Sequence, residues 1–185
     1  MKKFLVILGI SVIAIGATGF GAFKFMENAE QQLEKDNKLK EQADHVQVAK
    51  EKEEKEIKEQ TAKIGGVEYD TGLTFESTQN VVIDVMHKMT HQKVKAEDKW
   101  GAIPMISDTI NTVYDIISSS NFELKDDLLE IATRWKDSNF NNVVEDHNFF
   151  WEYQGGTIGK AYGQLSSIEE ETFVLNNFGE EIARE

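Results

Sequence analysis

The chain contains no cysteine and only one proline, Pro104, among 185 residues. Without cysteine it can form no disulfide, no thiolate metal site and no thiol nucleophile, and a structural zinc finger is excluded as well. Catalytic motifs are also missing, because there is no GxSxG serine motif and no complete GxxxxGK[ST] phosphate loop. From these absences we expect a protein that is not an enzyme and that carries no cofactor.

Basic side chains are scarce in the C-terminal two thirds of the chain. Residues 1–62 carry 10 basic and 11 acidic side chains, whereas residues 63–185 carry 10 and 22. Such an acidic surface repels phosphate backbones and anionic head groups. We therefore expect no nucleic acid partner for residues 63–185, and a cation, a basic protein or a neutral ligand fits their charge better.

A run of twenty uncharged, mostly apolar residues, Phe4–Phe23, follows two lysines at the N-terminus. As a helix it spans about 30 Å, the thickness of the hydrocarbon core of a bilayer. We expect residues 1–24 to anchor the protein in the cell membrane, with the N-terminus cytoplasmic because of the lysines and the remainder extracytoplasmic. The alternative is a signal peptide cleaved at the small-x-small sequence Ala17–Gly19, which would make the protein secreted. Glycines within the run also allow two such helices to associate as a homo-oligomer.

Residues 25–62 predict a charged helical stalk. Residues 27–62 contain no glycine or proline and are rich in lysine, glutamate and glutamine. Several acidic residues precede a lysine by four positions, as Glu34 precedes Lys38, which favours a solvated helix. A coiled coil has weak support, because Lys50 and Glu53 fall on positions that a heptad core would need to be apolar.

Residues 63–185 predict an all-α fold, a small helical bundle of about five helices. Residues 63–75 contain paired glycines and predict either a short hairpin or an irregular lead-in. Beyond them, apolar residues recur at helical spacing in five segments with short connections, which is typical of a bundle. The predicted buried stripes are Val82, Val85, Met86, Met89 and the stem of Lys93; Ile110, Val113, Tyr114 and Ile117; Leu124, Leu128, Ile131, Ala132 and Trp135; Val143, Val144, His147, Phe150 and Trp151; and Phe173, Val174 and Phe178.

Polar residues mark the expected ends of these helices. The first helix is expected to run to about Ala96, and Ser107 is expected to cap the second. Capping boxes at Ser120–Glu123 and Ser166–Glu169 predict the starts of the third and the last helix. Gly179 is placed to end the last one.

Three phrases carry a family resemblance: "MHKMTHQKVKAEDKWGAIPM", "IATRWKDSNF" and "EDHNFFWEYQGGTIGKAYGQLS". Together they resemble an uncharacterised family of membrane-anchored or secreted domains from Bacillus-like Gram-positive bacteria, over residues 76–178. The resemblance implies a small exported helical domain behind an N-terminal anchor. It brings no activity and no catalytic residue.

His87 and His91 lie four residues apart on the first predicted helix, which is a plausible spacing for metal ligands. They do not form the HExxH motif of zinc proteases, because Lys88 stands where the catalytic glutamate is needed. At 100° per residue His87 falls on the flank of the buried stripe and His91 falls opposite it, so we expect a surface pair that faces a neighbour. Metal binding is the alternative, with the set completed by Glu97, Asp98 or His147.

His147 stands on the apolar stripe of the fourth predicted helix, where a histidine is usually packed and hydrogen-bonded. It would otherwise line a pocket in company with Asp146 and Trp151. The glycines of the following run are expected to make a tight turn that could border such a pocket. Phe149 and Tyr153 lie off the stripe and would mark an exposed patch for a partner.

These patterns predict a membrane-anchored extracytoplasmic protein that binds a protein partner. The first alternative is a metal-binding domain or metal-assisted hydrolase that uses His87 and His91, and the second is a sensor of a small ligand. The predicted ligand-binding or partner-binding residues are His147, Trp151, Phe149, Tyr153, Gly155, Gly156 and Gly159.

Overall fold

The structure is a computed structural model that describes residues 32, 34, 35 and 37–184. The chain divides into two units, residues 1–54 and 55–185. The membrane span predicted at residues 4–23 lies outside the described residues. Among the helices that are described, none combines the length and the apolar character needed to cross a membrane.

The described part of the first unit is helical, as predicted for the charged stalk of residues 25–62. Residues 37–54 form helix with exposed side chains throughout. Lys38 Nζ lies 2.8 Å from Glu34 Oε1, so this predicted ion pair is formed. In the second unit, residues 55–60 are helical, and Gln60 is buried and exchanges two hydrogen bonds with the backbone of Ala96, at 2.8 and 3.0 Å.

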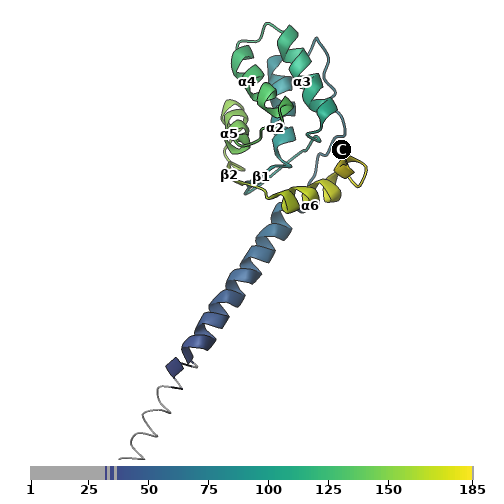
Figure 1. Cartoon of the computed structure of the whole chain (residues 1–185). Helices are drawn as coiled ribbons and strands as arrows, with labels where there is room; N and C mark the ends of the chain where they lie inside the picture. The colour runs from purple at the N-terminus through teal and green to yellow at the C-terminus, as the bar shows by residue number, and fades with distance from the viewer. Residues whose placement is uncertain (1–31, 33, 36, 185) are drawn as a thin grey trace, which may run out of the picture. The chain divides into compact units, whose positions relative to one another are not determined.

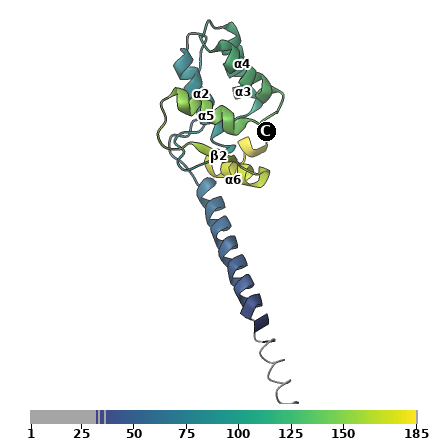
Figure 2. The ribbon, with the colours of Figure 1, turned by 90° about the vertical axis from the view of Figure 1, so that its left-hand side faces the viewer.

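The second unit contains the predicted five-helix arrangement. Its helices are α2 (Gln79–Thr90), α3 (Ser107–Ser119), α4 (Lys125–Lys136), α5 (Val143–Tyr153) and α6 (Ser167–Asn177), followed by the 3-10 turn η1 (Ile182–Arg184). The helix α2 packs against α5, and α3 packs against α4. Figure 1 shows α3 and α4 at one end of this unit and α6 at the other, and Figure 2 shows the same division from the side.

The main hydrophobic core fills the space between α2, α3, α4 and α5. The predicted stripes supply its centre, and the rings of Trp135 and Phe150 meet edge to face at 6.2 Å. A second cluster lies under α6. The fully buried apolar side chains of the main core are Val82, Ile83, Met86, Met89, Ile103, Val113, Ile117, Leu128, Ala132 and Phe150.

A two-stranded antiparallel sheet, which the all-α prediction missed, joins two distant segments. The strand β1 (Val94–Ala96) pairs with β2 (Ala161–Gln164), with Val94 opposite Gln164. The first helix was expected to run to Ala96, but α2 ends at Thr90 and the chain turns into β1. A strand of three residues is too short to display the alternation of period two, and its partner lies more than sixty residues away, so local pattern could not reveal it.

Of the three predicted helix caps, one is confirmed and two are wrong. Ser166 Oγ accepts from the Glu169 backbone N–H at 3.3 Å, and Glu169 Oε2 accepts from the Ser166 N–H at 2.7 Å, as a capping box requires. Ser120 instead ends α3, and α4 begins only at Lys125. Ser107 is already the first residue of α3, because Ile106 is the extended residue that precedes the helix.

Residues 63–75 form an irregular lead-in, the second of the two predicted alternatives. A single bridge joins Val67 to Ala102 in parallel orientation. Gly65 lies directly against the indole of Trp100, where an added Cβ would overlap the ring. The predicted end of the last helix is confirmed. Gly179 has a positive φ of 86° and its N–H bonds to Val174 O at 3.1 Å, so it ends α6.

Candidate metal centre

Three histidines from two helices meet where α2 packs on α5. His87 and His91 lie on successive turns at the end of α2, and His147 lies on the facing side of α5. One ring nitrogen from each of the three lies within 4.8 Å of the others. The ring centroids of His87 and His147 are 4.5 Å apart, and those of His87 and His91 are 4.9 Å apart.

The position of His91 corrects the prediction of a surface pair. His91 is 4% exposed and His147 is fully buried, whereas His87 is half-buried. The helical-wheel argument placed His91 opposite the core, but α2 ends at Thr90, and the segment that follows His91 folds back so that the Gly101 carbonyl bonds to its ring. Burial here comes from the loop, which a wheel of a single helix does not represent.

Hydrogen bonds fix the proton of His91 and of His87 on Nδ1. His91 Nδ1 lies 2.5 Å from the backbone carbonyl oxygen of Gly101, which can only accept, so Nδ1 is the donor. His87 Nδ1 lies 2.5 Å from Gln154 Oε1. The amide of Gln154 is oriented by Asp84, because Gln154 Nε2 donates to Asp84 Oδ1 at 3.2 Å and this leaves Oε1 to accept from His87.

The same pattern orients His147. Its Nδ1 lies 3.2 Å from Asn148 Oδ1. Asn148 Nδ2 donates to Ala161 O at 3.0 Å, and Asn148 Oδ1 accepts from Ala161 N at 2.9 Å, so the amide orientation is set by β2. His147 Nδ1 is therefore also the donor, and its Nε2 carries a lone pair.

In all three neutral imidazoles Nε2 is thus the ring nitrogen that carries a lone pair, and one ring nitrogen of each lies within 4.8 Å of the others. His87 Nε2 and His147 Nε2 are only 3.0 Å apart, and with both protons on Nδ1 they cannot hydrogen-bond to each other. Nitrogens that share a tetrahedral zinc ion at about 2.0–2.1 Å lie about 3.3 Å apart, so a small opening of this pair accommodates an ion. Donation of the other ring nitrogen to a carbonyl is the arrangement that orients metal-ligating histidines.

Burial holds the histidines in the neutral form that a metal requires. Desolvation lowers the pKa of His147 to about 4, with the neighbouring His87 adding to the effect. Desolvation also lowers the pKa of His91 well below its usual value and lowers that of His87, in which the hydrogen bond to Gln154 acts in the opposite direction. Neutral imidazole is the form that coordinates divalent transition metals.

A cavity of about 250 Å³ opens on one side of the cluster. His87 and His91 line it, whereas His147 is fully buried and does not. Lys88 also lines the cavity, but its ammonium is paired with Glu68 at 2.9 Å and Asp84 at 3.0 Å. The lysine is therefore neutralised by two carboxylates and does not oppose a cation at the histidines.

Other predicted site residues divide between this cavity and elsewhere. Trp151 and Gly159 line the cavity, and Gly156 lies against the Trp151 ring. Gly155 has a positive φ of 70° in the turn that follows α5. Phe149 packs on the main core instead, and the Tyr153 hydroxyl bonds to Gln79 and Asn80 at 3.0 and 2.7 Å. Of the acids suggested as further ligands, Asp98 lines the cavity, whereas Glu97 is exposed outside the cluster.

Sequence reasoning did not find the residues that orient the histidines. Gln154 and Asn148 are ordinary polar residues on α5 or at its end, and Gly101 acts through its backbone carbonyl. Asn148 follows His147 directly, which was a weak signal. The contact of Gln154 with His87 spans 67 residues and carries no local pattern.

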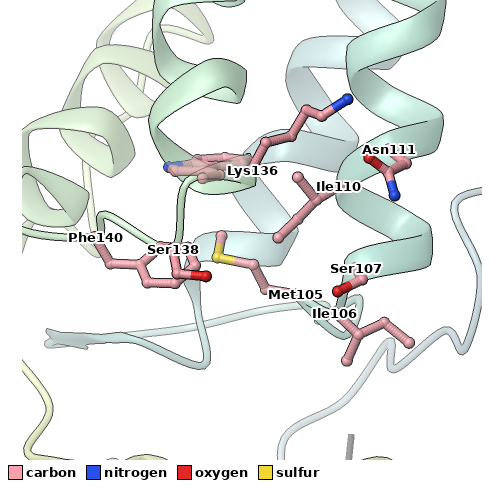
Figure 3. Close-up of a pocket in the computed structure, with 9 residues that line it drawn as sticks. Met105, Ile106, Ser107, Ile110, Asn111, Lys136, Ser138 and Phe140 are labelled. Carbon is pink, nitrogen blue, oxygen red and sulfur yellow. The ribbon is translucent and has the colours of Figure 1, made fainter.

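A second hollow, of about 220 Å³, lies between α3 and the end of α4 (Figure 3). Its walls are the apolar side chains of Met105, Ile110 and Phe140 together with small polar groups. Its one charged side chain is Lys136, whose ammonium lies 3.9 Å from the ring centroid of Tyr114. It gathers no group of ligand-type side chains comparable to the three histidines.

Comparison with known protein families gives a match. The model of a family of unknown function, DUF6241, matches residues 86–175, a span that includes all three clustered histidines. It lies inside the segment 76–178 that suggested an uncharacterised family, whereas the bacterial origin and the membrane anchoring stay predictions. No curated protein and no solved structure is significantly similar to the chain. Residues 86–175 are thus an uncharacterised domain, similar to a family whose function is unknown.

Proposed function

We propose that the domain binds one divalent transition-metal ion, of which Zn²⁺ is the best candidate, through Nε2 of His87, His91 and His147. The observation that carries this proposal is the common tautomer. Three separate carbonyl oxygens hold the protons on Nδ1, so the Nε2 lone pairs of His87 and His147 oppose each other at 3.0 Å, and a ring nitrogen of His91 lies within 4.8 Å of them. A cation at their meeting point relieves this repulsion and satisfies all three acceptors at once.

The chemistry of the ligand set favours the zinc class over Mg²⁺ or Ca²⁺. Magnesium and calcium prefer oxygen ligands, whereas imidazole suits zinc, copper, iron and nickel. The clustered ligand atoms are all imidazole nitrogens. Three histidines are also the protein ligands of some catalytic zinc sites, so the absence of cysteine is no obstacle.

The alternative role of a core histidine explains less of the geometry. A packed histidine needs one donor and one acceptor partner, and each Nδ1 here has its acceptor. For His147 and His87, however, Nε2 lies 3.0 Å from Nε2 of the other histidine. Packing alone therefore leaves two acceptors opposed, that of His147 on a fully buried side chain, which costs free energy that the ion would recover.

Metal loading of the full-length chain, purified in mild detergent and stripped with a chelator, tests the proposal. Isothermal titration with Zn²⁺ is expected to show one site. At free Zn²⁺ of 100 times the Kd, the free energy of unfolding should rise by about 2.7 kcal/mol. His87→Ala, His91→Ala and His147→Asn should each lose this gain while keeping the helical circular dichroism.

His45→Ala is the matched control, because His45 is an exposed histidine of the helix over residues 37–60. This variant should bind Zn²⁺ like the parent chain. A wild-type chain that binds no zinc, copper, nickel or cobalt would contradict the proposal. So would zinc binding that survives in all three cluster variants.

We also propose a cellular location and a partner for the domain. The apolar run at residues 4–23 supports a membrane-anchored domain on the extracytoplasmic side, and the acidic charge of residues 63–185 suits a basic protein partner. Cleavage of the run would release the same domain from the membrane. Fractionation of cells into membrane and soluble parts distinguishes the two.

A further inference from the structure

We infer that the metal keeps one coordination position open to the cavity, and that this position takes a small ligand with an anionic oxygen donor beside an aromatic or branched apolar group. The inference rests on the proposed metal site. The inference adds to the proposed metal site the class of ligand that it binds, which neither the sequence patterns nor the family match supplies.

The open position follows from how the three histidines are arranged around the cavity. His147 is fully buried, lies on α5 and does not line the cavity. His87 and His91 line the cavity of about 250 Å³. Three protein ligands with a fourth position left to water or a substrate is the arrangement of catalytic zinc sites, whereas structural sites use four protein ligands. No carboxylate among the described residues joins the cluster as a fourth ligand.

Two tryptophans border this cavity, and each is held against glycine backbone. Trp100 is 74% exposed, yet its ring lies on Gly65, where a Cβ would overlap it. Trp151 lies on Gly156 in the same way, and its Nε1 donates to Ile158 O at 2.7 Å. These contacts fix two indoles at the edge of the site in advance, so little conformational freedom is lost when a ligand packs on them.

The apolar character of this border matches an apolar group on the ligand. Ile158 also lines the cavity and is 69% exposed, so it adds to the accessible apolar surface beside the two indoles. Exposed aromatic side chains that are grouped beside a cavity mark binding sites more often than single ones do. A ligand that reaches the metal through its donor atom would cover this surface with its remaining part.

The charged side chains around the cavity indicate which donor atom of the ligand would bind the metal. Lys88 is already paired with Glu68 and Asp84, and Asp98 is an exposed carboxylate at the cavity. Among the described residues that line the cavity, the only cationic side chain is thus the paired Lys88, so the metal would supply the position that binds anionic oxygen. The acid at the border disfavours a second negative charge on the ligand, so a ligand with a single anionic group fits best.

Hydroxamates are suitable probes, because they carry one anionic metal-binding group on a variable substituent. The full-length chain is loaded with Co²⁺ in place of zinc, and its visible absorption is followed as acetohydroxamate or benzohydroxamate is added. Both are expected to change the spectrum. Benzohydroxamate should bind about tenfold more tightly, which corresponds to about 60 Å² of ring surface removed from water.

Trp100→Ala should remove this preference, so that the two hydroxamates bind within about threefold of each other, while Co²⁺ still binds one to one. Phe75→Ala is the matched control, because Phe75 is 75% exposed and does not line the cavity. This variant should keep the tenfold preference.

The outcomes separate the inference from the metal site itself. If Co²⁺ binds but neither hydroxamate alters the spectrum, the position is closed and the inference is wrong, although the metal site stands. Equal binding of both hydroxamates to the parent chain would refute the apolar part of the ligand class. Failure of Co²⁺ and Zn²⁺ to bind at all would refute the metal site.

Discussion

Acid should destabilise the metal-free protein because its clustered histidines are buried in the neutral form. The pKa of His147 falls from 6.5 to about 4 on folding, since desolvation penalises its charged form. Above pH 6.5 neither the folded nor the unfolded chain binds this proton, and stability is unaffected. As pH falls below 6.5 the unfolded chain takes up the proton while the folded chain does not until about pH 4, so the free energy of unfolding decreases over that window.

The structure sets the size of the effect. One proton changes the free energy of unfolding by about 1.4 kcal/mol per pH unit, so His147 alone accounts for about 2 kcal/mol between pH 6.5 and pH 5. The pKa of His91 is also held well below its usual value by burial, which adds a loss of the same sign. Because His147 is fully buried, solvent does not screen this contribution.

Urea unfolding of chelator-treated protein at pH 7.5, 6.5, 5.5 and 5 measures the effect. The same titrations on His147→Asn isolate the histidine, because surface carboxylates contribute alike to both proteins. The difference in unfolding free energy between parent and variant should shrink by about 2 kcal/mol from pH 6.5 to pH 5. A constant difference over this range would show that His147 titrates normally and would refute the burial argument.

Two further predictions concern side chains that orient the site or begin a helix. Gln154→Leu keeps all three histidines but removes the acceptor of His87 Nδ1. The affinity for Zn²⁺, measured by isothermal titration, should therefore fall about 10-fold to 100-fold. Gln47→Leu, on the exposed helix, is the control and should leave this affinity unchanged. Ser166→Ala removes the cap of α6 and should lower the free energy of unfolding by about 1 kcal/mol. Ser107→Ala should cost clearly less in the same urea titration, because Ser107 caps nothing; equal costs would mean that α3 begins one residue later than described.

Periodicity in the sequence was enough to find the five helices of the second unit. Each predicted stripe contains residues that are buried, such as Met86 on α2 and Phe150 on α5, because one face of a helix must leave water whatever it packs against. The capping box of α6 was also readable, since Ser166 and Glu169 interact within one turn. Residues Ser120–Glu123 match the same capping-box pattern but do not begin a helix, because they form the connection between the end of α3 and the start of α4 at Lys125.

The geometry of the candidate metal centre could be predicted only in part from local sequence patterns. The spacing of His87 and His91 was visible in the sequence, and His147 was predicted as a residue that could complete the set, whereas the helical wheel placed His91 opposite the core. Three tertiary contacts reversed that picture: the packing of α2 on α5, the Gly101 carbonyl over His91, and the reach of Gln154 to His87.

The sequence by itself determined the helical content, the acidic charge, the lack of thiol chemistry and the histidines available as ligands. These depend on composition and on contacts within one or two turns of a helix. Only the tertiary structure decided that the three histidines meet, that their protons lie on Nδ1, and that two tryptophans border their cavity. Each of these rests on contacts between segments far apart in the chain, such as His87 with His147 across sixty residues, and no local periodicity encodes them.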